Sequence, residues 1–370
     1  MIKAFDYLRY FEAHQAELLG AMERVIRSGQ LILGPEVKAI EHEFADFVGA
    51  RYAVGVASGT DALELALLVS GVSTGDEVIT VANSAVPTAA AIREVGAIPR
   101  FVEIDPVTLN IDPEAASRAV TPRTKAILPV HMHGFPCEME PLLELARSQG
   151  LQIIEDCAHA HGATRDGRHV GTAGHVSCFS FYPTKNLGAY GDGGICVSND
   201  HATAERLRAL RMYGMGPGRI AQTDGRNSRL DELQAAVLRV KLRHLPEQLA
   251  ARRRIAQRYR QGLANVELTL PPTESSSQSA YHQFVIRTAA REKLIAVLDD
   301  HEIGWGIHYD TPLHHMPAYR EFHSGRESLT HTETAARQML SLPIFPELED
   351  HEVDQVIAAV CSTLPSRSRR

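Results

Sequence analysis

Short apolar runs alternate with helical patterns between residues 52 and 197, and this alternation limits the folds that the chain can adopt. The runs are continuously apolar, which is typical of strands covered on both faces. The expected strands are residues 53–57, 78–81, 99–104, 126–130, 151–155, 175–181 and 194–197. Helical patterns such as residues 61–70 and 139–149 fall between the earlier runs. We therefore predict an α/β fold with a mostly parallel central sheet flanked by helices.

The rest of the chain predicts a second, smaller domain. A helix is expected over residues 229–242 and another after Pro246, followed by a loop at 271–279 that is rich in Pro, Ser and Gln. Beyond this loop we expect a strand at 282–287, a helix at 292–301, a glycine-punctuated strand at 303–309 and a terminal helix at 350–364. These patterns predict a large domain over residues 1–245 and a small C-terminal α+β domain over residues 246–370.

The composition of the chain argues against nucleic acids and membranes as partners. The formal net charge of −7 removes the electrostatic basis for non-specific binding of nucleic acid. No apolar run reaches membrane-spanning length, and the amphipathic first 25 residues do not resemble a signal peptide. The five cysteines are odd in number and lack CxxC spacing, which indicates buried free thiols in a reducing compartment. We expect a cytoplasmic protein with neither a nucleic-acid nor a membrane partner.

Lys185 lies between an apolar strand and a glycine-rich turn at residues 191–194. Its flanks are hydroxyls, aromatic residues and glycines, and the nearest ionisable partner along the chain is Asp192. Such surroundings lower the pKa of an amine by desolvation and make it a nucleophile toward an aldehyde. The alternative is an ordinary lysine in a loop that follows a strand.

Two further segments have the pattern of a ligand site. At residues 58–63 a strand is followed by a small-residue turn and a helix, which is a natural phosphate cradle, although Asp61 and Glu64 also fit a capping box. The strand at 151–156 ends in Glu155 and Asp156, at the edge where parallel sheets bind ligands. A carboxylate there can hold a ring nitrogen protonated, and His159 can hydrogen-bond another ring substituent.

Two pairs of histidines raise the alternative of a metal site. His131/His133 and His159/His161 both have HxH spacing, which in a strand places both rings on one face. Zinc needs three or four ligands, and the cysteines add none, so no metal is expected. A phosphate cradle, a strand-end aspartate and a lysine in glycine-rich surroundings instead match the needs of pyridoxal 5′-phosphate.

On these residues the chain resembles the DegT/DnrJ/StrS family of fold-type I pyridoxal-phosphate enzymes, the sugar aminotransferases. The resemblance covers almost the whole chain. The matching segments are residues 34–37, 58–60, 155–160, 180–181 with Lys185, 191–194, 227–236, and 307–309 with Pro312 and His314.

The resemblance implies roles for individual residues. Lys185 corresponds to the lysine that forms a Schiff base with the cofactor and carries the proton between the substrate carbon and C4′. Asp156 corresponds to the partner of the pyridinium nitrogen, and His159 stands where the family usually has a glutamine beside the phenolic oxygen of the ring. The residues that correspond to phosphate contacts are Gly59, Thr60 and Ser180.

Two other positions bear on assembly and on cofactor binding. Asn227 corresponds to a phosphate ligand supplied by the neighbouring subunit, which implies a homodimer with shared active sites; a simple helix start with an Asn or Ser cap also fits residues 227–229. Ala85 stands where family members commonly place an aromatic over the cofactor ring. Some relatives replace the lysine by histidine and become dehydratases, so Lys185 favours transamination.

The resemblance also implies a class of substrate. Residues 61–63 and the His308–Tyr309 pair with Pro312 are similar to those of enzymes acting on nucleotide-linked 3-keto-6-deoxyhexoses, such as a dTDP-3-keto sugar. Tyr182, His308 and Tyr309 would then contact the sugar or its diphosphate, with glutamate or glutamine as amino donor. Plain packing roles remain open for Tyr182 and His308. Alternative functions are amination of a C4 keto sugar or an aminocyclitol, and, more remotely, a non-catalytic regulatory protein that binds the cofactor.

Overall fold

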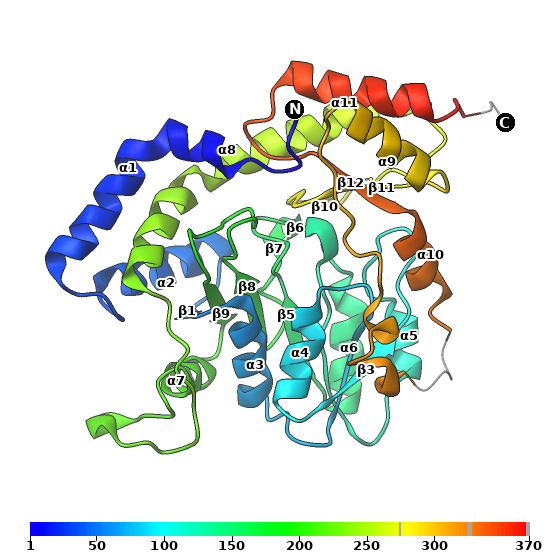
Figure 1. Ribbon diagram of the computed structural model, residues 1–370. Coiled ribbons are helices and arrows are strands. Elements are labelled where there is room, and N and C mark those ends of the chain that lie inside the picture. Colours follow the sequence, from blue (N-terminus) through cyan, green and yellow to red (C-terminus); the bar gives the residue numbers. More distant parts are fainter. Residues whose placement is uncertain (274, 324–327, 368–370) are drawn as a thin grey trace.

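A seven-stranded sheet forms the centre of the computed structural model, which describes residues 1–273, 275–323 and 328–367 (Figure 1). Its strands are β1 (Tyr52–Val56), β2 (Glu77–Val81), β3 (Ile98–Val102), β4 (Thr124–Ile127), β5 (Gln152–Asp156), β8 (Val176–Ser180) and β9 (Gly194–Ser198). Their order is β1-β9-β8-β5-β4-β2-β3, and β9 alone runs antiparallel to both of its neighbours. The prediction of an α/β fold with a mostly parallel sheet is confirmed.

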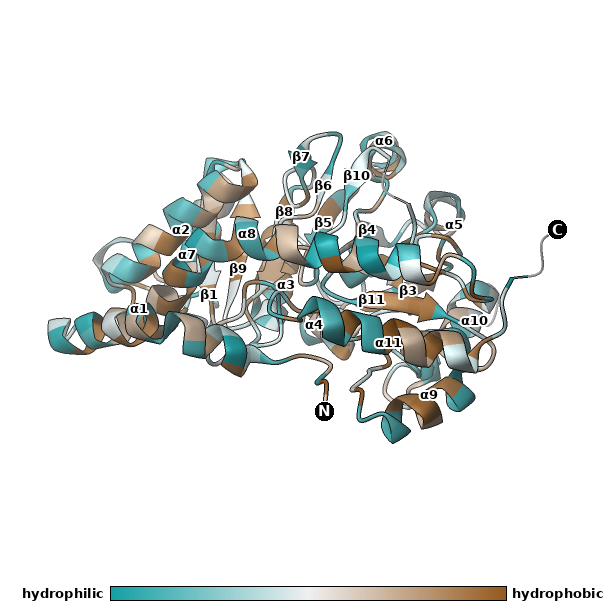
Figure 2. Cartoon of the chain, turned by 90° about the horizontal axis from the view of Figure 1, so that it is seen from above, coloured by the Kyte–Doolittle hydropathy of each residue, from teal (hydrophilic) through white to brown (hydrophobic). Residues whose placement is uncertain are grey.

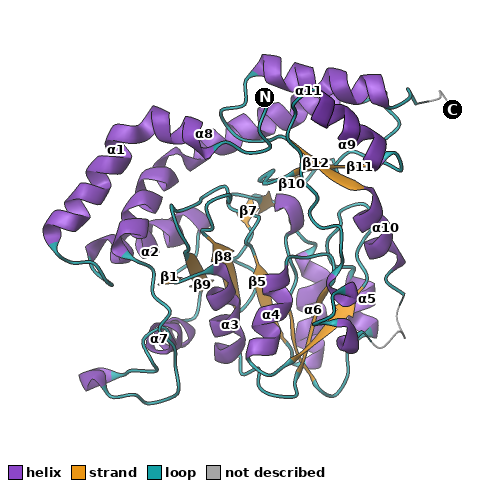
Figure 3. Ribbon diagram, in the orientation of Figure 1, coloured by secondary structure: helices purple, strands orange, loops and turns teal. Residues whose placement is uncertain are grey.

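Helices cover both faces of this sheet, which explains why its strands are continuously apolar (Figure 3). Along β9, Cys196 packs with residues of α3 (Gly59–Val69), while Ile195 and Val197 pack with residues of α2 (Pro35–Val48) and α8 (Glu232–Gly262). Side chains that alternate in direction along a strand are therefore buried on either side. Further helices in this part of the chain are α4 (Val86–Glu94), α5 (Pro113–Arg118), α6 (Met139–Gln149) and α7 (His201–Leu210).

Helix α8 corrects one expectation, because it continues through Pro246 where the sequence predicts two helices. A proline in a helix interior costs about 3 kcal/mol. Leu245 and Leu249 flank the proline and are almost completely buried, and burying such a side chain contributes about 1.5–3 kcal/mol each. Packing therefore offsets the loss of one helical hydrogen bond. The predicted domain division at residues 245 and 246 falls inside this single helix.

A second core lies around the C-terminal part of the chain. Here β11 (Phe284–Arg287) pairs antiparallel with β12 (Met339–Leu342), and the pair packs with α9 (Arg291–Asp300) and α11 (Asp350–Thr363). Ile2, from the other end of the chain, belongs to the same cluster. The predicted strand at 303–309 is wrong: it makes only isolated bridges from Ile303 to Ile2 and from Gly306 to Ser341. This segment crosses between two neighbours, so no ladder forms.

The remaining elements lie at the edges of these two cores. Helix α1 (Tyr7–Ser28) packs along the N-terminal half of α8, and Figure 2 shows hydrophilic and hydrophobic residues alternating along α8 and α11, as in amphipathic helices. The predicted loop at 271–279 contains β10 (Ser277–Gln278); its position 274 lies outside the described residues. β10 pairs with β6 (Thr164–Arg165), which pairs with β7 (Arg168–His169). Within the described part of the chain, no helix is long and apolar enough to cross a membrane.

Candidate active site

A cavity of about 360 Å³ opens at the carboxyl ends of β5 and β8, where the strand-end residues of the sheet meet the start of α3. This is the edge at which parallel sheets bind ligands. The cavity brings together most of the predicted site, although these residues come from distant parts of the sequence. The predicted residues that line it are Gly59, Thr60, Ala85, Asp156, His159, Ser180, Tyr182, Lys185, His308 and Tyr309.

Lys185 lies in the turn that follows β8, where its backbone N–H donates to the carbonyl of Tyr182 at 2.8 Å. Burial lowers the pKa of Lys185 to about 8, and the nearby carboxylate of Asp156 opposes this shift. The sequence points to Asp192 as the nearest charge, but the charge that acts on Lys185 is Asp156, from a neighbouring strand. An amine with this pKa is partly neutral near pH 7 and can act as a nucleophile.

Asp156 ends β5 and is held by two hydrogen bonds. Its carboxylate accepts from the backbone N–H of Ala158 at 3.1 Å and from the hydroxyl of Thr88 at 3.0 Å, and Thr88 in turn contacts the Ser84 hydroxyl at 2.7 Å. Burial raises the pKa of Asp156, while these donors and Lys185 oppose the shift. A cation bound beside this buried carboxyl would lower its pKa again. No sequence signal marked Thr88 and Ser84 as partners of Asp156.

The start of α3 serves as a helix cap and also faces the cavity. Ser58 accepts a hydrogen bond from the Asp61 N–H at 3.1 Å and donates to its carboxylate at 2.6 Å. Glu64 takes no part in the cap and forms an ion pair with Arg226. The proposed capping box of Asp61 and Glu64 is therefore replaced by a Ser58–Asp61 cap.

The first amides of α3 belong to Gly59 and Thr60, and a helix provides no acceptor for its first amides. These donors and the helix dipole favour an anion. A Cβ atom on Gly59 would lie 2.6 Å from the Cβ of Ser180, so only glycine allows α3 to start this close to the end of β8. The close approach brings the Ser180 hydroxyl beside the free amides.

The ring of His159 is buried, and its surroundings favour the neutral form. Burial lowers the pKa of His159 well below its usual value, and the charges of Lys185 and nearby histidines act in the same direction. Its ring lies 4.5 Å from that of His282, and its Nδ1 has no hydrogen-bond partner among the described residues. A buried polar atom without a partner is costly, so Nδ1 is placed to bond a group that enters the cavity.

His131 and His133, one of the two HxH pairs, do not bind the same group. His131 precedes a short 3-10 turn, η1 (Met132–Gly134), and His133 lies within it, so the expectation of two rings on one face of a strand is wrong. His133 contacts the side-chain oxygen of Gln283 at 2.7 Å, while His131 contacts Glu155 at 3.0 Å.

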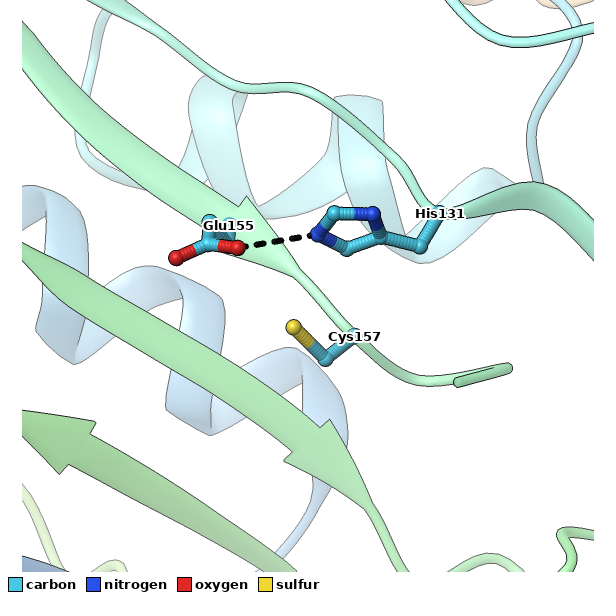
Figure 4. A group of neighbouring side chains, drawn as sticks. All are labelled: His131, Glu155 and Cys157. Atoms are coloured by element: carbon cyan, nitrogen blue, oxygen red, sulfur yellow. Dashed lines mark hydrogen bonds and ion pairs between the residues drawn. The ribbon is translucent and has the colours of Figure 1, made fainter. Parts of the chain in front are cut away.

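His131, Glu155 and Cys157 form a buried group beside the site (Figure 4). The backbone N–H of Cys137 donates to Nδ1 of His131, which leaves the Nε2–H of His131 to donate to Glu155. Glu155 also accepts hydrogen bonds from the N–H groups of Gly171, Ala173 and Gly174 and from the hydroxyl of Ser177. These donors occupy the lone pairs that a metal would need, and the group fixes β5 instead.

The other predicted site residues have distinct positions. Asn227 is exposed, pairs in an isolated bridge with Met212 and does not line the cavity. Tyr182 is 53% exposed at the cavity. His308 bonds the Ser341 hydroxyl at 2.8 Å, and burial raises the pKa of Tyr309 to about 12. Tyr182, His308 and Tyr309 thus line the cavity, while Asn227 is exposed outside it.

Comparisons with known proteins show what the chain is similar to. Residues 12–361 match the model of the DegT/DnrJ/EryC1/StrS aminotransferase family. The chain is 45% identical over 362 residues to the dTDP-3-amino-3,4,6-trideoxy-alpha-D-glucose transaminase of Micromonospora megalomicea subsp. nigra, covering 96% of this chain and 97% of that protein. It is 40% identical to a pleiotropic regulatory protein of Geobacillus stearothermophilus, covering 97% of each. The crystal structure of S. venezuelae DesV in complex with a ketimine intermediate superimposes with a TM-score of 0.94 at 44% identity, covering 98% of both chains.

Proposed function

Because the chain belongs to the DegT/DnrJ/EryC1/StrS aminotransferase family, we propose that it is a pyridoxal-phosphate-dependent aminotransferase of amino-sugar biosynthesis. Its acceptor is the keto carbon of a nucleotide-linked 3-keto-6-deoxyhexose, most simply a dTDP sugar, and its donor is glutamate or glutamine. One observation carries the proposal. The amine of Lys185, with its lowered pKa, shares a cavity with the Asp156 carboxyl and the free amides at the start of α3.

The residues present fit this cofactor. The amides of Gly59 and Thr60 and the Ser180 hydroxyl are donors for a phosphate, and the buried Asp156 carboxyl calls for a cationic partner. The unpaired Nδ1 of His159 is available for an oxygen on the ring. Pyridoxal phosphate, when bound, supplies an aldehyde that exchanges amino groups and a protonated ring that withdraws electrons from the reacting carbon.

Three ionisable residues of the cavity then have defined tasks. Lys185 provides the neutral amine that attaches the aldehyde, and its pKa of about 8 lets it take up and release a proton near neutral pH. Asp156, oriented by Thr88 and the Ala158 amide, keeps the proton on the ring nitrogen. His159 is neutral, so it forms a hydrogen bond to the ring without adding a positive charge.

Tyr182, His308 and Tyr309 are assigned to the sugar. They line the same cavity as Lys185, and Tyr182 is exposed there. A dTDP-3-keto sugar is supported by the similarity to the transaminase of Micromonospora megalomicea subsp. nigra. Amination of a C4 keto sugar or an aminocyclitol is the alternative within this chemistry. The regulatory alternative has support in the name of the Geobacillus stearothermophilus relative, but Lys185 and Asp156 are the groups that turnover requires.

We propose a homodimer in which Asn227 reaches the cofactor phosphate of the partner subunit. Asn227 is exposed and lies outside the cavity of its own chain. The segment that precedes it exposes Tyr213 and Ile220, by 43% and 62%, which suits a surface that another subunit covers. We also assign the enzyme to the cytoplasm, where its five free cysteines, all but Cys361 buried, would stay reduced.

The proposal is tested with purified holoprotein and a panel of acceptors. Glutamate alone should convert the bound cofactor to its amino form, and a dTDP-3-keto-6-deoxyhexose should then regenerate the starting spectrum faster than a 4-keto sugar or a keto-cyclitol. Lys185→Ala should lose the lysine-bound spectrum and turnover, whereas Lys125→Ala, which removes an exposed lysine of β4, should keep both.

Three results would overturn parts of this assignment. A spectrum unchanged by glutamate and by glutamine would favour a regulatory protein. Faster turnover of a 4-keto sugar or a keto-cyclitol would show that the proposed substrate class is wrong. Turnover by Lys185→Ala would remove Lys185 from the reaction.

A further inference from the structure

Three histidines and a glutamate gather outside the active-site cavity. His314 and His315 lie in the short 3-10 turn η3 (Leu313–His315), Glu333 lies in α10 (Thr330–Gln338), and His323 follows the turn η4 (Arg320–Phe322). None of these side chains lines the cavity of Lys185. We call His314, His315 and Glu333 the His314 cluster; their ligand atoms all lie within 4.8 Å of one another.

The distances in the His314 cluster fit a metal better than hydrogen bonds. The Nε2 atoms of His314 and His315 both point to the same oxygen, Oε1 of Glu333, at 3.4 and 3.3 Å. A charge-assisted hydrogen bond would be about 2.7–2.9 Å long. Zinc bonds of about 2.0–2.1 Å in tetrahedral geometry place neighbouring ligand atoms about 3.3–3.4 Å apart. The two N–O distances match this spacing, and all three ligand atoms lie within 4.8 Å of one another.

The fold holds the two halves of the His314 cluster in place independently. The N–H of Leu313 donates to the carbonyl of Ala82 at 3.0 Å, just beyond the end of β2. Glu103, just beyond the end of β3, accepts from the N–H groups of His331 and Thr332 at 2.7 and 2.9 Å and so fixes the start of α10. The ligands therefore need little rearrangement to bind an ion, which lowers the entropic cost of binding.

The surroundings of His314 bury its ring, with Nε2 on the side of Glu333. His314 is 2% exposed, and its Nδ1 has no hydrogen-bond partner among the described residues. Its ring packs against those of His315 and His323, at 4.1 and 4.9 Å. Arg337 lies 3.9 Å from the other oxygen of Glu333, which leaves Oε1 for the histidines. Without an ion, two imidazoles share one carboxylate oxygen at distances longer than that of a strong hydrogen bond.

We propose that the His314 cluster binds one zinc ion per chain, with solvent in the fourth position. Imidazole and carboxylate ligands in tetrahedral geometry suit zinc. The side chain of His315 is 52% exposed, which leaves a path for the ion. The ion would join η3, a few residues after Tyr309, to α10, and so stabilise the segment that follows the cavity residues His308 and Tyr309. The ion would link these two segments and take no part in the proposed reaction.

The test uses tag-free holoprotein that has been treated with a chelator and desalted. Titration with zinc should show one ion per chain, and saturation should raise the Tm by about 2–4 °C, because the ion binds the folded state. Cobalt should give the intense visible bands of a tetrahedral ion without thiolate charge-transfer absorption. Thiolate bands would instead place the ion at Cys157 and overturn the assignment.

Matched variants locate the site. His315→Leu and Glu333→Gln should each weaken zinc binding by about 100-fold. His315 is partly exposed, so its substitution should not disturb folding. The control is His351→Leu, which removes another exposed histidine paired with a glutamate, Glu349, at 3.1 Å; this variant should bind zinc as the parent does. Binding that is absent in the parent, or unchanged in both test variants, would show that the His314 cluster is only a hydrogen-bonded group.

Discussion

The lowered pKa of Lys185 predicts how fast its amine reacts with an aldehyde at a given pH. A fall from 10.5 to about 8 means that burial disfavours the protonated amine by about 3 kcal/mol. At pH 7 about a tenth of the chains then carry a neutral amine, compared with about 0.03% for an unperturbed lysine. Since only the neutral amine attacks an aldehyde, Lys185 should react about 300-fold faster at pH 7 than a lysine in water of equal nucleophilicity.

The assay is the reaction of cofactor-free protein with excess pyridoxal, followed by absorbance across about pH 6 to pH 10. Pyridoxal lacks the phosphate, so phosphate titration does not contribute. The rate should rise about tenfold per pH unit below pH 8 and then level off. The stability of the cofactor-free protein should also rise with pH between about 8 and 10.5, because the unfolded chain binds the proton more tightly.

Asp156→Asn gives the decisive comparison. Asp156 raises the pKa of Lys185, so its replacement by a neutral amide should move the midpoint below that of the parent protein. Asp192→Asn is the control: Asp192 lines the same cavity but does not contribute to the shift, so the midpoint should stay in place. The reasoning would be refuted if the rate of the parent protein still rose tenfold per pH unit above about pH 9, or if the midpoint of Asp156→Asn lay at a higher pH than that of the parent.

Three other predictions concern assembly and stability. Mixing inactive Lys185→Ala and Asn227→Asp subunits should recover about a quarter of the parent transamination rate, because half of randomly mixed dimers carry one intact site; exchange confirmed by native mass without activity would contradict the shared site. Lys241 donates a buried hydrogen bond to the Gly188 carbonyl at 2.6 Å. Lys241→Met leaves this carbonyl without its donor and should lower the free energy of unfolding, measured in urea, by about 1–3 kcal/mol. An unchanged free energy would show that this hydrogen bond does not stabilise the fold. Glu155→Gln should lower the free energy of unfolding by about 3–5 kcal/mol or prevent folding, because the new side-chain NH2 group would face backbone N–H donors. A variant that calorimetry shows to be as stable as the parent, and that binds the cofactor, would contradict this.

Much of the fold could be predicted from the sequence because its signal is local. The seven expected sheet strands appear within a few residues of their observed bounds, and the helix at 139–149 has the observed ends. The errors arise where distant packing overrides local preference. Pro246 remains inside a helix because leucines on either side are buried, and residues 303–309 form no strand because their two neighbours are residue 2 and β12. The division at residues 245 and 246 stays a prediction.

The chemistry of the candidate site was also present in the sequence, in the form of a lysine, a strand-end aspartate and a small-residue helix start. What the sequence could not show is which groups act on one another. Asp156 rather than Asp192 determines the charge environment of Lys185, and Thr88 orients Asp156 from 68 positions away. Such couplings depend on distances across strands, which chain spacing does not encode.

The sequence by itself determined the order of strands and helices and the reactive groups at their ends, because both depend on residue type and short-range periodicity. Only the tertiary structure decided the protonation of those groups and the partners they meet. Burial and Coulomb interactions act through space, so the pKa of Lys185, the neutral state of His159 and the convergence of His314 and His315 on Glu333 exist only in the folded chain.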